Sequence, residues 1–155
     1  MMGETIETRL SDLGVVLPAA AAPAANYLPF MRSGNLLFTS GQLPLKDGKL
    51  QSSGLLGRDL DIAACKEAAK LCAINVLAQA KAALGDLAKI GRIVKIAVFV
   101  ASSPDFTEQH LVANGASDFL AAALGARGKH ARAAVGVSSL PLNAAVEVEA
   151  VIEVD

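Results

Sequence analysis

The sequence predicts an α+β fold, in which one mixed β-sheet carries two α-helices packed on one face. Three segments indicate this fold. Residues 61–84 repeat apolar side chains at helical spacing, residues 92–101 are rich in β-branched residues, and residues 145–154 alternate between apolar and polar side chains. The chain has 155 residues, of which 53% are apolar, so we expect a folded domain with a substantial core.

The first 22 residues are expected to form an N-terminal helix and a linker. An apolar stripe over residues 5–13 predicts the helix, and Gly14 suits its end. Alanine and proline dominate residues 18–25, which favours an extended linker. The sequence therefore predicts an N-terminal segment, 1–22, followed by one domain, 23–155.

The next segments predict short strands and then a long helix. Residues 27–32 and 36–40 flank a Ser-Gly-Asn turn and are expected to form a hairpin, with a short third strand near Leu50. Asp59 or Asp61 can cap the helix of residues 61–84, and Gly85 marks its end. Its apolar arc is wide, which favours contacts on more than one face.

The second half of the chain predicts a central strand and a second helix. Residues 92–101 are apolar at most positions, so we expect this strand to be covered on both faces. A helix is expected over residues 105–124, with Ser103 as its cap and Pro104 in its first turn. Gly115 inside this helix costs about 1 kcal/mol relative to alanine. Close packing at that position would explain it.

Two alternating strands are expected to end the chain as a hairpin. One begins at Ala131, the other spans residues 145–154, and a Leu-Pro-Leu-Asn turn joins them. Two helices cover only one face of the sheet. Because several strands are apolar on both faces, we expect another copy of the protein to cover the second face.

Composition and charge exclude several classes of partner. The net charge is −1, with acids and bases mixed along the chain, whereas nucleic-acid binders carry a basic excess or stripe. Pro18 and Pro23 interrupt the apolar run 13–25, which argues against a membrane helix. The first ten residues lack the basic start and apolar core of a secretory signal. We therefore expect a cytoplasmic protein with no nucleic-acid or membrane partner.

Cysteine and histidine spacing predicts neither a disulfide nor a metal site. Cys65 and Cys72 are two helical turns apart, roughly 10 Å along the axis, which is too far for a disulfide. They are expected to pack as small core residues. His110 and His130 are isolated and lack metal-ligand spacing. No metal site is expected.

Arg132 and Glu147 are the first candidates for a functional site. An arginine fork holds a carboxylate through two parallel hydrogen bonds, and a nearby carboxylate can polarise water or shuttle a proton. Glu149 shares one strand face with Glu147. This pairing favours a pocket for a small anionic substrate. A cross-strand ion pair is the structural alternative, and from spacing alone it is the more common arrangement.

Three motifs, in the same order along the chain, resemble those of a known family. Residues 35–44 read N-L-L-F-T-S-G-Q-L-P, like the family pattern of Gly-Asn, two hydrophobic residues, Ser-Gly-Gln, a hydrophobic residue and Pro. Residues 98–106 contain its Val-Phe-Val and Asp-Phe elements, and residues 131–149 resemble its segment from Ala-Arg through Leu-Pro to Val-Glu-Val-Glu. Over roughly residues 23–154 the chain thus resembles the RidA/YjgF family of reactive-intermediate deaminases. Its N-terminal extension and longer 105–130 region resemble the divergent branch described as chorismate-mutase-like in fold.

The resemblance implies a RidA-type, chorismate-mutase-like fold and a homotrimer whose sheets form a central barrel with clefts between subunits. It also implies hydrolysis of enamines or imines, such as 2-aminoacrylate and 2-imino acids, to 2-keto acids and ammonia without a cofactor. Arg132 matches the family arginine that anchors the carboxylate of a small substrate. Glu147 matches the acidic residue that orients the attacking water.

The resemblance places four further residues in the cleft. Ser40 matches the serine of Ser-Gly-Gln, Tyr27 matches the tyrosine over the substrate, and Asn114 matches the asparagine of the second helix. Their structural alternatives are a hydroxyl bonded to local backbone, a packing tyrosine and a solvent-facing asparagine. Ala134 stands where the family often has cysteine, so thiol chemistry is excluded there and only its backbone can contribute.

Other functions stay open at the level of sequence. The same cleft could bind a keto acid or similar metabolite without turnover. An endoribonuclease or translation-inhibiting activity is sometimes attached to the family, but the chain lacks a basic stripe and a histidine pair. Chorismate mutase activity is disfavoured because the C-terminal strands supply one arginine for a dicarboxylate substrate.

Overall fold

The computed structural model describes residues 4–23 and 25–155. Its centre is a five-stranded sheet in the order β1-β2-β7-β5-β6. The pair β5–β6 is parallel and the other pairs are antiparallel, so the predicted mixed sheet is confirmed. The strands are β1 (Phe30–Ser33), β2 (Leu36–Thr39), β5 (Ile90–Ala101), β6 (Ala131–Val137) and β7 (Val146–Val154).

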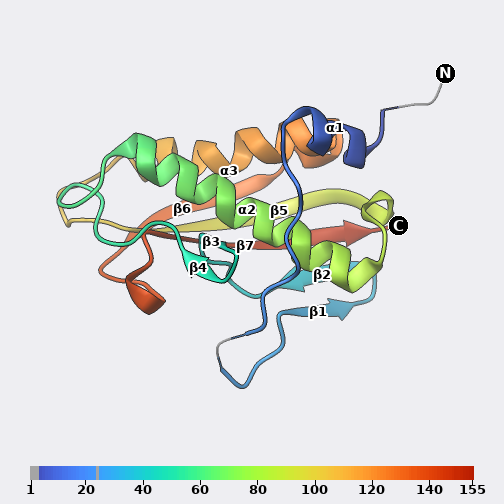
Figure 1. The fold of residues 1–155 in the computed structure, drawn as a ribbon, viewed down its shortest axis with the longest axis horizontal. Helices are drawn as coiled ribbons and strands as arrows, with labels where there is room; N and C mark the ends of the chain where they lie inside the picture. The colour runs from blue at the N-terminus through green and yellow to red at the C-terminus, as the bar shows by residue number, and fades with distance from the viewer. Residues whose placement is uncertain (1–3, 24) are drawn as a thin grey trace.

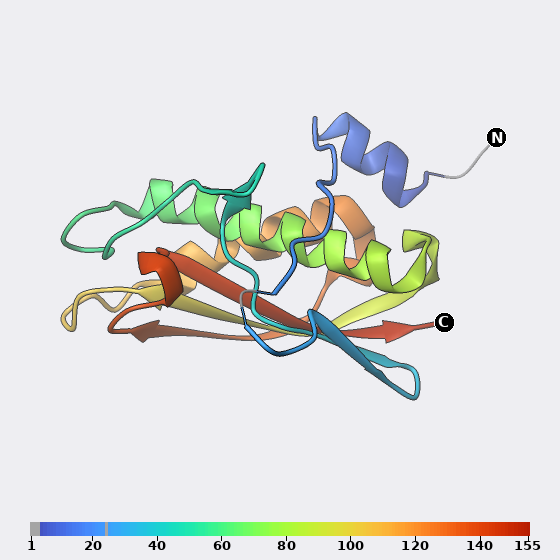
Figure 2. The same cartoon turned by 60° about the horizontal axis from the view of Figure 1, so that its bottom comes forward.

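Two long helices cover one face of this sheet. They are α2 (Ile62–Leu84) and α3 (Gln109–Leu124), and they lie side by side on the same layer (Figure 1). Figure 2 shows the sheet below them with its other face uncovered. Side chains that point from the sheet to the helices, such as Ile96, Val98 and Val148, are fully buried. The predicted α+β fold with two helices on one face is therefore confirmed.

Short elements flank this core. A separate ribbon of β3 (Leu45–Lys46) and β4 (Lys49–Leu50) packs against α2, where one short strand was expected. Three short 3-10 helices are also present among the described residues: η1 (Leu87–Lys89), η2 (Gly125–Gly128) and η3 (Pro141–Asn143). No helix in the described part of the chain is both long and apolar enough to cross a membrane.

The N-terminal helix α1 (Ile6–Asp12) forms as predicted and packs against α3. The Thr5 hydroxyl oxygen caps it by accepting a hydrogen bond from the Thr8 N–H at 3.1 Å. Ile6 and Leu10 bury their side chains. The linker that follows contains neither helix nor strand up to residue 23, and residue 24 lies outside the described residues.

The helix α2 matches its prediction at both ends. Asp61 caps it, with Oδ1 accepting from the Ala64 N–H at 2.8 Å, and Gly85 ends it with a φ of 79°. Cys65 and Cys72 are free and buried in the core. Burial, with the Asp61 charge as a lesser cause, raises the pKa of the Cys65 thiol to about 11. Both cysteines act as packing residues.

The helix α3 begins later than the sequence predicts, at Gln109 rather than at residue 105. The Phe106 N–H donates to the Ser103 carbonyl at 3.0 Å, so Ser103 and Pro104 belong to a tight turn. The Gln109 side-chain amide then holds the Phe106 carbonyl at 2.8 Å. These local bonds satisfy the backbone in a conformation that competes with the first helical turn.

Close packing at Gly115 is confirmed. The glycine lies where α3 touches α2, and a methyl group at this position would collide with the Lys66 backbone carbonyl. The helices can approach this closely only because position 115 has no side chain. The helix-propensity cost of glycine is thus offset by the contact it permits.

The predicted C-terminal hairpin is wrong, because β5 lies between β6 and β7. The chain leaves β5, passes through α3 and returns as β6 parallel to β5, which is a βαβ crossover. β6 therefore occupies the edge of the sheet. β7 pairs with the opposite side of β5 and with β2, where both its edges are hydrogen-bonded.

Candidate functional site

Arg132 lies on the edge strand β6 and turns its side chain toward α3. It pairs with Ile96, whose side chain faces the helices, so Arg132 shares that face. Its Nη1 donates to Asn114 Oδ1 at 2.9 Å and to Ser117 Oγ at 3.0 Å, and its Nη2 donates to the His110 carbonyl at 3.0 Å. Three neutral acceptors thus hold the guanidinium.

The helical repeat explains this arrangement. His110, Asn114 and Ser117 are separated by four and three residues, so they lie on one face of α3. None of the ion pairs in the described part of the chain includes Arg132. Its Nε–H and one Nη2–H make no hydrogen bond to the described residues. An arginine fixed in this way keeps its charge and two donors for an anion, and a carboxylate accepts such a fork in parallel.

A shallow hollow borders this guanidinium. It has a volume of about 480 Å³ and is lined by Arg132, Ser117, His130, Lys129, Asp118, Ala121 and Gly128. Ser117 Oγ lies 2.8 Å from His130 Nε2, and His130 Nδ1 lies 2.6 Å from the Gly128 carbonyl oxygen. Ala134 follows two residues after Arg132 on the same strand face and packs against the core.

Glu147 and Ser40 lie near the start of β7, and Tyr27 precedes the residue to which Ser40 is bonded. A Cβ at position 41 would collide with the Glu147 carboxylate, so Gly41 permits this carboxylate to lie against the backbone. The Ser40 hydroxyl donates to the Leu28 carbonyl at 2.6 Å, so the local backbone bond foreseen for it is present. Tyr27 precedes Leu28, and its side chain is 50% exposed.

Burial raises the pKa of Glu147 above its ordinary value of 4.5, and the neighbouring Glu149 raises it further. The carboxyl group is half-buried and accepts no hydrogen bond from the described side chains. A carboxylate with a raised pKa is a stronger base toward water than an exposed one. This residue can therefore take a proton from a water molecule beside it.

The two groups do not meet within one chain. Arg132 pairs with Ile96, whereas Glu147 pairs with Phe99 three residues further along β5. An odd offset places the two side chains on opposite faces of the sheet. The alternative of a cross-strand ion pair between Arg132 and Glu147 is therefore wrong, because β5 separates their strands. Asn114 does lie beside Arg132, and Ser40 is adjacent to Gly41, against which the Glu147 carboxylate lies.

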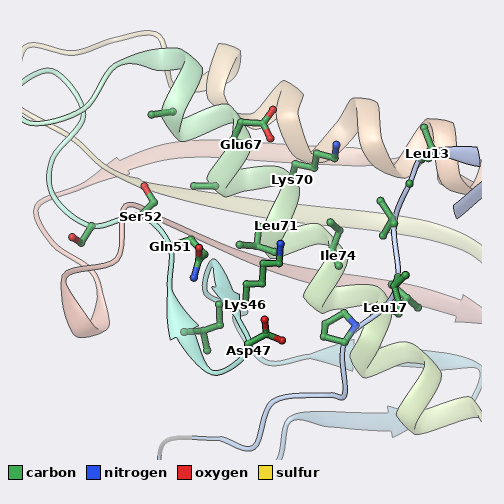
Figure 3. A pocket seen from close by; sticks show the side chains of 18 of the residues that line it. Leu13, Leu17, Lys46, Asp47, Gln51, Ser52, Glu67, Lys70, Leu71 and Ile74 are labelled. Atoms are coloured by element: carbon green, nitrogen blue, oxygen red, sulfur yellow. The ribbon is translucent and has the colours of Figure 1, made fainter. Parts of the chain in front are cut away.

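A larger hollow lies away from both groups. It has a volume of about 1080 Å³ and lies between the α1–linker segment, the β3–β4 ribbon and α2 (Figure 3). Leu17, Leu71 and Ile74 contribute apolar walls. Its charged residues are two lysines and two acids: Lys46, Lys70, Asp47 and Glu67. None of the predicted site residues lines this hollow. Its two positive and two negative side chains give no preference for an anion. We therefore place the site at Arg132, although the hollow there is smaller.

Ser117 and His130 contact the site but were not predicted from the sequence. A usable signal exists for each of them. Ser117 is three residues after Asn114, which puts both on one helical face. His130 is two residues before Arg132, so an extended chain would turn both side chains to the same side. Neither signal points to a function until the parallel pairing of β5 and β6 brings α3 over the edge strand.

A stability change on removing the Glu147 charge is expected. Because the pKa of Glu147 is higher in the folded chain than in the unfolded chain, its ionisation opposes folding as pH rises above 4.5. Glu147→Gln should therefore raise the melting temperature at neutral pH, and the gain should shrink on acidification. Calorimetry across pH checks this. The exposed Glu149→Gln is the control and should give a smaller shift; a melting temperature that falls in Glu147→Gln would contradict the assignment.

The fold and the site define a class of protein: a small α+β domain whose edge strand presents an arginine that neutral groups of a neighbouring helix hold, with a half-buried glutamate on the opposite face of the sheet. The family model described as "YjgF/chorismate mutase-like, putative endoribonuclease" matches residues 7–154. The chain therefore belongs to the YjgF/RidA family, and the predicted family membership is confirmed.

Relatives and solved structures agree with this membership. Protein TCP17 of Trypanosoma cruzi is 50% identical over 151 residues, which cover 97% of this chain and 94% of that protein. A crystal structure of a protein of unknown function from Agrobacterium tumefaciens is 59% identical, covers 97% of this chain and 92% of that chain, and superposes with a TM-score of 0.92. RidA from an Antarctic Psychrobacter is 27% identical, with coverages of 87% and 94% and a TM-score of 0.62.

Proposed function

We propose that this protein hydrolyses small enamines or imines that carry a carboxylate, such as 2-imino acids, to 2-keto acids and ammonia. The observation that carries this proposal is the Arg132 guanidinium, which neutral acceptors hold in place and which forms no ion pair with a carboxylate of residues 4–23 or 25–155. Such a group is suited to a small anion. Membership of the YjgF/RidA family supports the same chemistry.

The reaction needs only positioning and one proton acceptor. The substrate carboxylate binds the free edge of Arg132, which fixes the C=N carbon in space. Glu147 accepts a proton from water as the water oxygen bonds to that carbon and the C=N π electrons move to nitrogen. Glu147 then gives this proton to the nitrogen, which completes the carbinolamine. Glu147 next carries the hydroxyl proton to the nitrogen as the C–N bond breaks and the C=O bond forms, which leaves a keto acid and ammonia. Because an imine is already electrophilic, holding water and substrate together supplies much of the acceleration.

A complete site in this proposal requires two copies of the chain. Arg132 with Asn114 would come from one subunit, and Glu147 with Ser40 and Tyr27 from its neighbour. Two different surfaces that meet head to tail form a ring when the rotation between subunits closes. The homotrimer is the ring that we propose. The uncovered sheet face supports it, because Met31, Phe38 and Val135 are exposed there on the Glu147 side.

Dissociation of the trimer is expected when this apolar face becomes charged. Phe38 is 41% exposed in one chain and pairs with Met31 and Val151 on the uncovered face. Phe38→Asp should leave the subunit folded but lower the mass in sedimentation from three times 15.9 kDa to 15.9 kDa. Val16→Asp, at a linker residue that is 90% exposed, is the matched control and should stay trimeric. A wild-type protein that sediments as a monomer would contradict the proposal.

The activity is tested with imino acids generated in place by an amino-acid oxidase. Wild-type protein should accelerate ammonia and keto-acid release above the spontaneous rate, and Arg132→Ala should remove that acceleration. Equal rates with and without the wild-type protein would overturn the proposal. If the protein is instead a binding module, a 2-keto acid should raise its melting temperature without any turnover.

The family description also names an endoribonuclease. The chain has a net charge of −1 and His130 is bonded to Ser117 and Gly128, so the site offers neither a basic track nor a histidine pair for acid–base chemistry. RNA incubated with the purified protein should therefore stay intact. Cleavage that co-purifies with the protein and disappears in Arg132→Ala would revive this activity.

A further inference from the structure

His130 and Ser117 form a short hydrogen-bonded chain that ends on the Arg132 guanidinium. His130 Nδ1 lies 2.6 Å from the Gly128 carbonyl oxygen, and its Nε2 lies 2.8 Å from Ser117 Oγ. Ser117 Oγ in turn accepts a hydrogen bond from Arg132 Nη1 at 3.0 Å. The chain thus runs from the end of η2 through α3 to the edge strand β6.

The Gly128 carbonyl fixes the position of one proton in this chain. A carbonyl oxygen only accepts, so His130 Nδ1 carries the proton. In the Nδ1–H tautomer Nε2 has a lone pair, to which the Ser117 hydroxyl can donate. The remaining lone pairs of Ser117 Oγ are free to accept from Arg132. The histidine therefore makes Ser117 an oriented acceptor for the guanidinium.

Without an acceptor at His130 Nε2, Ser117 would lose this orientation. A serine inside a helix readily turns its hydroxyl to the carbonyl of the preceding turn. Its oxygen would then no longer be directed at Arg132 Nη1. Asn114 Oδ1 and the His110 carbonyl would still accept hydrogen bonds from Arg132, but the bond from Nη1 to Ser117 would be lost.

We infer that His130, acting through Ser117, is a positioning residue that keeps Arg132 in the orientation that grips the substrate carboxylate. This inference rests on the proposed function. The competing interpretation is purely structural: the bond from His130 Nδ1 to Gly128 would only tie η2 to the start of β6. The two ring nitrogens serve these two roles separately, so the roles can be separated by substitution.

Two amide variants of His130 distinguish the role of Nε2 from the role of Nδ1. Glutamine places an amide near the position of Nε2 and can accept from Ser117, whereas asparagine places an amide near Nδ1 and can donate to Gly128. Loss of one hydrogen bond to a charged group changes binding about tenfold. His130→Asn should therefore raise KM for the imino acid about tenfold at a kcat within about twofold of wild type. His130→Gln should restore KM to within about threefold. The reverse ranking would overturn the inference in favour of the structural role.

A double-mutant cycle tests whether Ser117 is the link. Ser117→Ala should raise KM by a similar factor, and adding His130→Asn to it should raise KM no further. If KM in the double variant rises by the product of the two single-variant factors, His130 does not act through Ser117. In addition, nitrogen–proton NMR correlation of the wild-type protein should show His130 protonated at Nδ1 and not at Nε2; a proton on Nε2 would contradict the inference.

The same assay separates this inference from the proposed function. Arg132→Ala is measured beside the His130 variants. If Arg132→Ala turns over the imino acid as fast as wild type, the proposed function fails. If Arg132→Ala loses turnover while His130→Asn keeps the wild-type KM, the proposed function stands and only the role of His130 is lost.

Discussion

Arg132→Ala should lower kcat/KM for a 2-imino acid by about a thousandfold or more, because a two-bond charged fork to the substrate carboxylate is lost. The loss is expected in KM and kcat together, since an unanchored substrate no longer presents its C=N carbon to water. Arg132→Lys keeps the charge but not the fork, and should recover only a small part of the activity. Steady-state kinetics with imines generated in place measure both variants.

Arg92→Ala is the matched control for this prediction. Arg92 is also a strand arginine, but its side chain is 65% exposed and lies 3.7 Å from Glu153. An exposed ion pair of this kind contributes little to stability. Arg92→Ala should therefore turn over the imine at the wild-type rate. Equal losses in Arg92→Ala and Arg132→Ala would point to a general charge effect and contradict an anchoring role.

Gly115→Ala should destabilise the protein by about 2 kcal/mol or more, which is the reverse of what helix propensity predicts. Propensity alone favours alanine over glycine in a helix interior by about 1 kcal/mol. The methyl group, however, would collide with the Lys66 backbone carbonyl of α2. Since backbone cannot rotate away as a side chain can, the two helices must separate. Denaturant unfolding gives the sign and the size of the change.

Ala122→Gly, at an exposed position in the same helix, isolates the propensity effect. It should cost about 1 kcal/mol. Both substitutions should destabilise the protein, although one replaces glycine with alanine and the other replaces alanine with glycine. A Gly115→Ala protein more stable than wild type would show that α2 and α3 do not meet as closely as described.

Local patterns were sufficient for the helices. The apolar repeat of α2, its cap at Asp61 and its end at Gly85 are all decided by neighbours within one or two turns. The start of α3 failed for a local reason as well, since the turn at Ser103 competes with the helix. Where residues a few positions apart decide the structure, the sequence was a reliable guide.

Strand pairing could not be predicted in the same way. β6 and β7 are separated by a short connection and alternate well, which favours a hairpin, yet β6 pairs with β5 through a crossover that includes α3. The choice depends on how α3 packs over the sheet, and no window of sequence contains that information. The error matters, because a hairpin would have placed Arg132 and Glu147 on neighbouring strands.

The candidate residues were named from the sequence, but their arrangement was not. Arg132 and Asn114 do meet, and Glu147 lies near Ser40 across Gly41. That the two groups occupy opposite faces follows from the register of β5 with both neighbours. His130 was dismissed as isolated because its partners, Ser117 and Gly128, become neighbours only after α3 and β6 pack together.

Mixing of subunits tests whether one site is built from two copies of the chain. Arg132→Ala and Glu147→Gln proteins, each inactive alone, are unfolded together, refolded in equal amounts and assayed for imine hydrolysis. In a head-to-tail trimer, random association joins an intact Arg132 side to an intact Glu147 side at about one site in four, so about a quarter of wild-type activity should return. A mixture that stays as inactive as its components would contradict a shared site.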